Sequence, residues 1–565
     1  MSSVLIRNGL VVDGTGREAF PADVLVEGDR IADVIARPNP NPLPQVPDMD
    51  ATGCLVTPGF IDAHAHSDAY LLIEPDAPSK LSQGITTEIN GQCGGSVAPR
   101  YGAARLSSDW ASMTYPGGDG TPGPTWRSLA EYRALLDQVR PAINTVQFVG
   151  HNTLRSSVIG YDAVRATPET LREMENLLAR ELDDGGWGLT TGLIYQPGKY
   201  SDSAEVMALA RVAAARGGYY ATHMRSEGDA IIEAIDEVLD LVRATGIRAE
   251  ISHLKTSGKR NWGKIDAVLE KIQRAVDAGE LLGSDRYPYC AAGTDLDVVF
   301  PDWAGEGGVV AEIKRLADPA TRARIAAEID AQDRDWSTVM IGGTWSEATR
   351  PFSGKRISEA IAKLREFGRM GSPLPVAANP ETPETQDNPE IPIAVASTPG
   401  TLVCSILAAD ACRTGAFFFG MSEENLQKIL SRPWIVPGSD ASLRAPWGPL
   451  GADHPHPRAY GTMPRFFRLL TGRVEGHARI CSREEAIKRM TSVPAARFGI
   501  RDRGVIRAGA YADITVWNED SFRETATYTS PHSFCKGVEA VLVNGVVALR
   551  AGEFTGNRSG RFLER

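Results

Sequence analysis

The chain has 565 residues, of which 42% are hydrophobic and 23% are charged, as in an ordinary soluble globular protein. Its net charge of −11 argues against nucleic acid or an anionic membrane surface as a partner. No apolar run is long enough to cross a bilayer, and the start MSSVLIRNGLVVDG lacks the features of a signal peptide. Seven scattered cysteines do not form a disulfide framework, so we expect a cytoplasmic protein.

Both ends of the chain have the pattern of short strands separated by Gly and Asp turns. The strand-like runs cover residues 3–14, 22–36, 504–518 and 537–553. We therefore predict that residues 1–57 and 496–565 are two parts of one small β-sandwich.

The middle of the chain, residues 58–495, alternates apolar strand patterns with helical patterns. Helix-like spacing of apolar residues, followed by a Gly, covers 167–185, 203–217 and 227–246. Eight strand candidates are found, at 59–66, 86–92, 144–151, 188–194, 219–224, 248–253, 281–289 and 434–440. Eight strands that alternate with helices predict an α/β fold of the (β/α)₈ TIM-barrel type.

The interval before the eighth strand is too long for one crossover between barrel strands. Residues 290–432 contain several helix-like pieces and the Pro-rich stretch at 373–392. We interpret this interval as a lid inserted over the barrel mouth, with a mobile segment inside it.

The first barrel strand, PGFIDAHAH, ends in two histidines that are one residue apart. Alternate residues of a strand point to the same side, so His64 and His66 project together. Two neutral imidazoles held side by side form half of a zinc-type site. An HxH pattern alone is weak evidence, because a histidine at a strand end is more often a satisfied polar group.

Four further residues of metal-ligand type follow other barrel strands: Cys93, His223, His253 and Asp440. Each has a simpler explanation, since Cys93 suits a small buried apolar position and Asp440 suits the N-cap of a helix. The recurrence at strand ends, where barrel active sites lie, favours a site for one or two zinc ions instead.

Other candidates surround these six residues. Asp62 could orient a ligand histidine or simply be a buried hydrogen-bonding group, and His151 fits the site or a structural role equally. Tyr195 could donate to a substrate carbonyl, although core packing is the usual role of a tyrosine. The basic residues Arg225, Lys255 and Arg458 would suit a carboxylate-bearing substrate. His454, His456 and His477 are interpreted as loop residues, and the other six cysteines as packing residues.

Several motifs together resemble the amidohydrolase superfamily, and within it the D-aminoacylase (N-acyl-D-amino-acid deacylase) group. They are PGFIDAHAHSD, SQGITTEINGQCGGSVAP, GHNTLR, GLIYQPG, ATHMRSEGD, ISHLK, DRYPYCAAGT, PGSD and HPRAYGTMPR, and the similarity runs almost from end to end. Cys93 is the more specific feature, because many relatives have a carboxylated lysine in the barrel where this group uses cysteine.

The resemblance implies a zinc-dependent hydrolase that deacylates N-acyl-D-amino acids by means of a metal-activated water. It implies that Cys93, His223 and His253 hold a tight metal, while His64, His66 and Asp440 border a second, weaker position. Asp440 would transfer protons and Tyr195 would polarise the scissile carbonyl. Lys255, Tyr287 and Arg458 would bind the substrate's carboxylate. One departure is Gly293, which stands where this group has a serine.

Two other functions stay open at the level of sequence. One is an amidohydrolase that opens a ring or acts on a xenobiotic amide. Cys93 disfavours the ring-opening enzyme, whereas Gly293 leaves the xenobiotic amide open as a substrate. The other is a non-catalytic scaffold, which would typically have lost metal ligands that this chain retains. The expected partner is a small N-acyl amino acid or related amide, and a homo-oligomer is compatible with the sequence.

Overall fold

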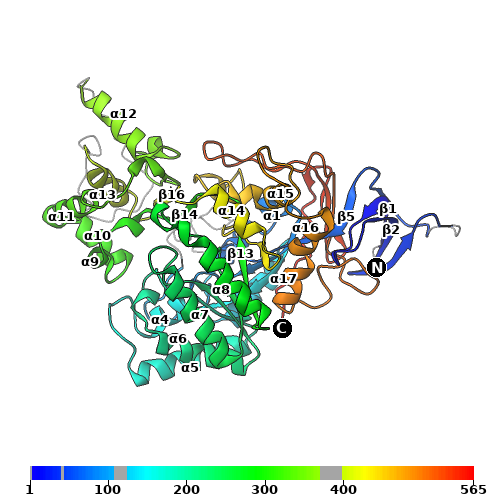
Figure 1. Ribbon diagram of the computed structural model, residues 1–565, viewed down its shortest axis with the longest axis horizontal. Helices are drawn as coiled ribbons and strands as arrows, with labels where there is room; N and C mark the ends of the chain where they lie inside the picture. Colours follow the sequence, from blue (N-terminus) through cyan, green and yellow to red (C-terminus); the bar gives the residue numbers. More distant parts are fainter. Residues whose placement is uncertain (1–2, 40–43, 107–123, 370–396) are drawn as a thin grey trace.

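The computed structural model describes residues 3–39, 44–106, 124–369 and 397–565, so the Pro-rich segment at 373–392 lies outside the described residues. Figure 1 shows three regions: a β-rich region at the right, a barrel below the centre and an inserted region at the upper left.

Parallel strands at eight positions form the barrel, and the third position is split into two short strands. In order they are β6 (Phe60–Asp62), β7 (Ile85–Asn90), β8 (Asn144–Gln147) with β9 (Val149–Gly150), β10 (Gly188–Gly192), β11 (Tyr219–His223), β12 (Arg248–Ile251), β13 (Leu282–Arg286) and β17 (Ile435–Pro437).

The barrel strands pair in two runs, β6-β7-β8 and β9-β10-β11-β12-β13-β17. The amide of Phe148, between β8 and β9, donates to the Asn90 carbonyl at 3.0 Å. At the other junction, the Ala63 amide donates to the Pro437 carbonyl at 3.1 Å and links the first strand to the last. The eight positions agree with those predicted from the sequence.

Helices follow most of these strands and cover the outside of the barrel. They are α1 (Pro78–Leu81), α3 (Leu129–Val139), α4 (His151–Val158), α5 (Pro168–Asp183), α6 (Ser203–Ala215), α7 (Ile231–Thr245), α8 (Ile265–Asp277), α15 (Arg458–Leu470), α16 (Arg483–Met490) and α17 (Ser492–Arg497). Short 3₁₀ turns are η1 (Asp68–Leu72), η2 (Gly198–Tyr200), η3 (Lys259–Lys264) and η8 (Pro449–Gly451).

Helices α5 and α7 show how local sequence sets these elements. The side chain of Thr167 caps α5 and Pro168 occupies its first turn, which are two ordinary start signals. Helix α7 ends at Gly246, whose φ of 66° is the left-handed conformation that glycine tolerates. The pattern over 227–246 was predicted to be helical throughout, but α7 begins only at Ile231, and residues 227–230 form a loop.

Both ends of the chain join one nine-stranded sheet. Its strands are β1 (Ser3–Val11), β2 (Phe20–Glu27), β3 (Arg30–Ala36), β4 (Asp48–Asp50), β5 (Leu55–Pro58), β18 (Ile514–Trp517), β19 (Val538–Val543), β20 (Val546–Arg550) and β21 (Glu553–Phe554). The ends meet where β5 pairs antiparallel with β18, with Val56 opposite Val516. These two side chains lie in an apolar cluster that draws on both ends, as expected for one shared unit.

The inserted region has a sheet and a core of its own. Strands β14 (Ala292–Asp295), β16 (Gly415–Phe418) and β15 (Val339–Ile341) pair antiparallel in that order. Its helices and turns are η4 (Leu296–Val299), α9 (Asp302–Gly305), α10 (Val309–Ala317), α11 (Pro319–Asp330), η5 (Trp336–Thr338), η6 (Arg350–Phe352), α12 (Ile357–Arg369), α13 (Pro399–Ala409) and α14 (Glu423–Leu430). Leu316, Ile325 and Leu402 belong to a separate apolar cluster here. In Figure 1 the sheet lies beside the barrel, and α10 to α13 extend away from it.

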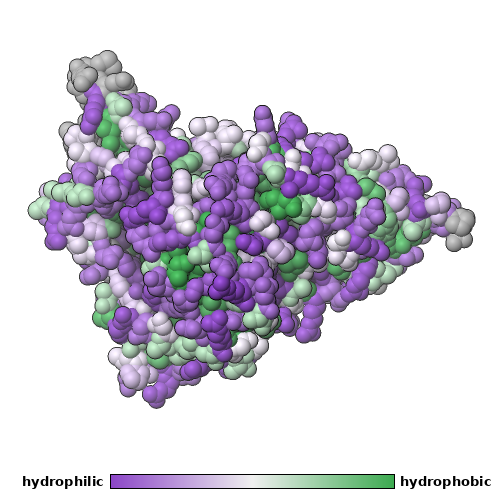
Figure 2. Space-filling model, viewed as in Figure 1, coloured by the Kyte–Doolittle hydropathy of each residue, from purple (hydrophilic) through white to green (hydrophobic). Residues whose placement is uncertain are grey.

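Figure 2 shows a largely hydrophilic face on which apolar side chains form small separate patches. None of the helices in the described ranges combines the length and apolarity that a bilayer crossing needs.

Candidate metal centre

All six predicted ligands lie at the carboxyl ends of barrel strands, where loops can bring them together. His64 and His66 follow β6, Cys93 follows β7, His223 ends β11, His253 follows β12 and Asp440 follows β17. The structure therefore brings together side chains that the sequence places up to 376 positions apart, from residue 64 to residue 440.

Three of these residues have a backbone conformation that L-amino acids rarely adopt. Cys93, His253 and Asp440 have φ values of 52°, 37° and 49°. Such conformations cost about 1–3 kcal/mol each and collect at functional sites, because the surrounding fold must maintain them. The fold therefore directs these side chains into the cluster despite the backbone cost.

The first cluster consists of Cys93, His223 and His253, whose candidate ligand atoms all lie within 4.8 Å of one another. The Cys93 sulfur is 3.3 Å from Nε2 of His253. The rings of His223 and His253 are 4.5 Å apart, centre to centre, and nearly perpendicular. This is a compact set of one sulfur and two imidazole donors.

The second cluster shares Cys93 and adds His64, His66 and Asp440 within the same 4.8 Å limit. Asp440 Oδ1 is 3.0 Å from His66 Nε2 and 3.4 Å from His64 Nε2. His64 Nε2 is also 3.3 Å from the Cys93 sulfur. The thiol thus lies between the two clusters.

The charges around the clusters favour an ionised thiol and an ionised carboxyl. Burial alone would raise the pKa of the Cys93 thiol, but His64 and His253 outweigh it and hold that pKa well below its usual value. Burial also opposes the charge on Asp440, yet Arg458 and His253 keep the pKa of its carboxyl well below the ordinary range.

The donor set fits a divalent cation that binds nitrogen and sulfur. Both ring nitrogens of His223 are buried, and neither has a hydrogen-bond partner among the described residues. An imidazole in that state loses the hydrogen bonds that water would give it, and a bound cation would compensate one of its nitrogens. One thiolate with two imidazoles is a combination typical of zinc.

Two buried carboxylates hold the cluster from behind. Asp285, at the end of β13, has Oδ2 3.1 Å from His64 Nδ1, while its Oδ1 accepts from the His253 amide at 3.0 Å. Asp62 accepts from the Ser439 amide at 2.7 Å and pairs with the buried Lys80 at 2.9 Å. Asp62 therefore fixes the ends of β6 and β17 rather than a ligand ring. Sequence reasoning missed Asp285, although it lies near the carboxyl end of a buried barrel strand, as the ligands do.

The residues expected to bind a carboxylate gather around the ring of Tyr287. The guanidinium of Arg458 lies 4.7 Å from the ring centre, and Lys255 Nζ lies 5.8 Å from it. A third cation, Arg286, lies 4.2 Å from the same ring and was not predicted. Within the described ranges, the buried Tyr287 hydroxyl has no hydrogen-bond partner. Arg458 Nη1 is also 2.8 Å from Asp440 Oδ2, which connects this group to the metal cluster.

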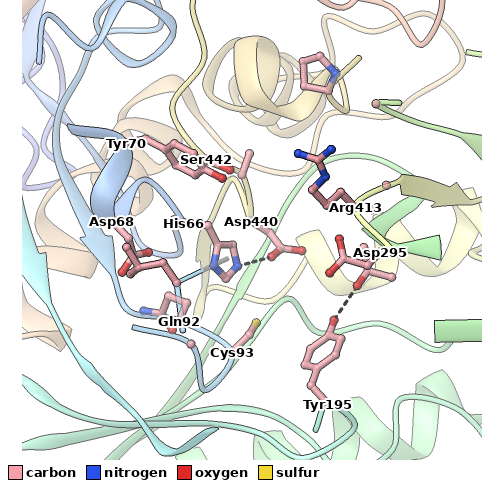
Figure 3. A pocket seen from close by; sticks show the side chains of 18 of the residues that line it. His66, Asp68, Tyr70, Gln92, Cys93, Tyr195, Asp295, Arg413, Asp440 and Ser442 are labelled. Carbon is pink, nitrogen blue, oxygen red and sulfur yellow. Dashed lines mark hydrogen bonds and ion pairs between the residues drawn. The ribbon is translucent and has the colours of Figure 1, made fainter. Parts of the chain in front are cut away.

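A cavity of about 580 Å³ opens beside the clusters. Figure 3 shows His66, Asp440 and Cys93 together on its wall, with Tyr195 pointing into the same space. Burial and the nearby Cys93 thiolate raise the pKa of Tyr195 well above its usual value, so its hydroxyl keeps its proton. The inserted region supplies another wall, which includes Thr294, Trp345, Arg413 and Phe417. The insertion is thus a lid in the sense that it bounds the cavity.

The remaining histidine and arginine candidates divide between structure and site. His151 pairs with Glu205 at 2.8 Å, and Arg225 pairs with Glu237 at 3.0 Å, so both have partners outside the clusters. His456, interpreted from the sequence only as a loop residue, lines the cavity and accepts from the Arg458 amide at 3.0 Å.

Gly293 also lines the cavity. A Cβ built there would lie 3.5 Å from the Arg458 guanidinium, so a serine at this position would adjoin it.

Comparison with known proteins agrees with this architecture. The model of the amidohydrolase family matches residues 49–362 and 416–549. An N-acyl-D-glutamate deacylase and a D-aminoacylase of Alcaligenes xylosoxydans xylosoxydans are 34% and 30% identical to the chain. Both alignments cover 100% of the chain, and they cover 96% and 97% of these relatives.

A solved structure of similar fold is that of an N-acyl-D-glutamate deacylase from Bordetella bronchiseptica, complexed with zinc and a phosphonate inhibitor that mimics the tetrahedral intermediate. It is 30% identical, has a TM-score of 0.76, and the match covers 100% of the chain and 99% of the solved one. The family match omits residues 1–48, 363–415 and 550–565, so it rests on the barrel, part of the terminal sheet and part of the insertion.

Proposed function

The chain belongs to the amidohydrolase family, and from that premise we propose that it hydrolyses N-acyl-D-amino acids to a carboxylate and a free D-amino acid, using zinc. The observation that carries the proposal is the convergence of Cys93, His223 and His253 at the mouth of the barrel. The relatives that match over the whole chain are deacylases of this kind.

Cys93, His223 and His253 would hold the tightly bound zinc ion, and His64, His66 and Asp440 would border a second position. A zinc ion bound there supplies a Lewis acid and lowers the pKa of water to about 7. The ionised thiol adds negative charge that the neutral imidazoles lack, which strengthens the site for a divalent cation.

Asp440 is the proton carrier in this mechanism. Its carboxylate is charged, lies against the cavity and has Oδ1 only 3.0 Å from His66 Nε2. It accepts a proton from the attacking water and gives it to the departing nitrogen, which leaves poorly as an anion. Arg458 at 2.8 Å keeps the carboxyl ionised before the reaction starts.

Tyr195 donates a hydrogen bond to the scissile carbonyl oxygen. The phenol is protonated at neutral pH, and its ring lies 4.9 Å from that of His223, beside the first cluster. A fixed donor at the place where negative charge develops stabilises the transition state more than the ground state.

Arg458, Lys255 and Tyr287 bind the carboxylate of the amino acid. Lys255 is charged, because Glu227 outweighs the effect of burial and raises the pKa of the Lys255 ammonium. Arg458 lines the cavity and Lys255 lies near the same Tyr287 ring, so together they would hold the substrate's carboxylate at a fixed distance from the metal ligands and set the position of the amide.

A panel of N-acyl D- and L-amino acids, assayed for released amine, tests this function. We expect turnover of D-configured substrates, its loss on treatment with a zinc chelator and its return when zinc is added. A wild-type protein that binds no zinc, or that binds zinc and hydrolyses none of the panel, would refute the proposal.

The cytoplasm is the compartment we propose, since Cys93 must stay reduced to act as a ligand. The net charge of −11 supports a small-molecule substrate over nucleic acid or an anionic membrane as the partner.

A further inference from the structure

Glu227 contacts both histidines of the first cluster and one of the proposed carboxylate-binding residues. Its side chain is 10% exposed and lies in the loop between β11 and α7. Oε1 is 2.9 Å from His253 Nδ1 and pairs with Lys255 Nζ, while Oε2 is 3.5 Å from His223 Nε2. One carboxylate thus reaches three residues for which the proposed function already gives roles.

The loop that carries Glu227 is fixed to its surroundings. The Glu227 carbonyl accepts from the Ser257 amide at 2.7 Å, which ties the loop after β11 to the loop after β12. Asp229, two residues further on, pairs with Arg260 and accepts from Asn261 at 3.0 Å. The carboxylate is therefore held in place before any ligand arrives.

Hydrogen-bond chemistry decides what Glu227 does for His253. Nε2 of His253 faces the Cys93 sulfur, so a cation in this cluster would bind that nitrogen, and Nδ1 would carry the ring proton. Nδ1 would then be a donor, with Lys255 Nζ at 2.7 Å and Glu227 Oε1 at 2.9 Å as its polar neighbours. An ammonium has no lone pair, so the carboxylate must accept this hydrogen bond.

His223 has the same need on the other side of the carboxylate. Neither of its ring nitrogens has a hydrogen-bond partner among the described residues, and Nε2 points at Glu227 Oε2 from 3.5 Å. A metal bound through Nδ1 would leave Nε2–H as a donor, and a shift of a few tenths of an ångström would complete a bond to Oε2.

We propose that Glu227 is a positioning residue that orients both histidines of the tight metal site and at the same time holds the Lys255 ammonium for the substrate. This inference rests on the proposed function for the metal and for the role of Lys255. Its new content is that one side chain links metal affinity to recognition of the substrate's carboxylate.

The variant Glu227→Gln tests this link, because it keeps the shape of the side chain and removes its charge. We expect zinc affinity, measured by competition with a chelator, to fall about 10- to 100-fold, the usual effect of removing such a carboxylate. The KM for an N-acyl-D-amino acid should rise in the same variant. Cobalt substituted for zinc should show altered visible absorption, since the histidine geometry changes.

Two variants serve as comparisons. Glu237→Gln removes a carboxylate near the same loop that pairs with Arg225 and Ser203 rather than with a metal ligand, and it should leave zinc affinity and the cobalt spectrum unchanged. Lys255→Met should raise KM while zinc affinity is retained, which separates the two roles that Glu227 joins.

A folded Glu227→Gln protein with wild-type zinc affinity and wild-type KM overturns the inference and leaves the proposed function intact. A loss of only one of the two properties overturns the link between them. If Glu227→Gln does not fold, Glu227→Asp can replace it, because its carboxylate is one methylene further from the ligands. We then expect a smaller fall in zinc affinity and a smaller rise in KM. Failure of the proposed function would instead be seen in the wild-type protein, as absence of bound zinc or of turnover.

Discussion

The two halves of the metal centre differ in how far they face the cavity. His66 and Asp440 line the cavity and are 30% and 11% exposed, whereas His223 and His253 are 5% and 1% exposed; His64 is fully buried beneath the exposed pair. We name the set of Cys93, His223 and His253 the closed half, and the set of His64, His66, Asp440 and the shared Cys93 the open half. Closed sites hold a metal, and open positions allow substrate to approach it.

The charged partners of the two halves differ in the same sense. The closed half contacts Glu227, which lies behind the ligands. The open half contacts Arg458, which lines the cavity. One set of residues therefore holds the metal and the other acts on the substrate, and the two sets share the sulfur atom of Cys93. Three substitutions test this division.

Replacing the shared ligand should have the largest effect. We expect Cys93→Ser to lose bound zinc and about 10⁴-fold of kcat, because the Lewis acid supplies several kcal/mol of transition-state stabilisation. Metal analysis and steady-state kinetics measure both. Cys290→Ser is the matched control, since that thiol donates to Glu423 at 3.0 Å and lies in neither half. If Cys93→Ser retains zinc, the two halves do not depend on a common sulfur.

Removing the charge of Asp440 should impair the open half and leave the closed half able to bind zinc. We expect Asp440→Asn to retain the zinc of the closed half and to lose about 10³-fold of kcat, within the usual range for a general acid–base group. Asp453→Asn is the control, because Asp453 also lines the cavity but pairs with Arg444 at 2.8 Å. A near-normal rate for Asp440→Asn would remove it from proton transfer, and loss of all zinc would show that the halves are not independent.

The members of both halves were predictable from the sequence, and the residues behind them were not. Each ligand follows a short apolar strand, and parallel barrel strands end on one face, so the convergence follows from the pattern. Glu227 lies instead at the start of a pattern that predicts a helix, and only the real start of α7 at Ile231 shows that it is in a loop. Arg286 and Asp285 belong to a buried strand, where sequence alone does not show which side chains meet a ligand.

The inserted region was predictable as an insertion but not as a structure. Its length exceeds one crossover, which is a property of the sequence. Its three strands β14, β15 and β16 pair antiparallel across long intervals, and such register depends on packing that local patterns do not contain. The wall that this region gives the cavity was therefore visible only in the fold.

The smallest effect should come from Arg458, which touches the open half from the substrate's side. We expect Arg458→Ala to raise KM about 10- to 100-fold for substrates with a free carboxylate, the equivalent of about 1.5–3 kcal/mol for a charged hydrogen bond. The same substrates with the carboxylate converted to a neutral amide should show little change between wild type and variant. Because Arg458 also lies 2.8 Å from Asp440, a second outcome is informative. A fall in kcat at constant KM would assign Arg458 to the open half as the partner of Asp440. Arg458 would then support proton transfer and would not bind the substrate's carboxylate.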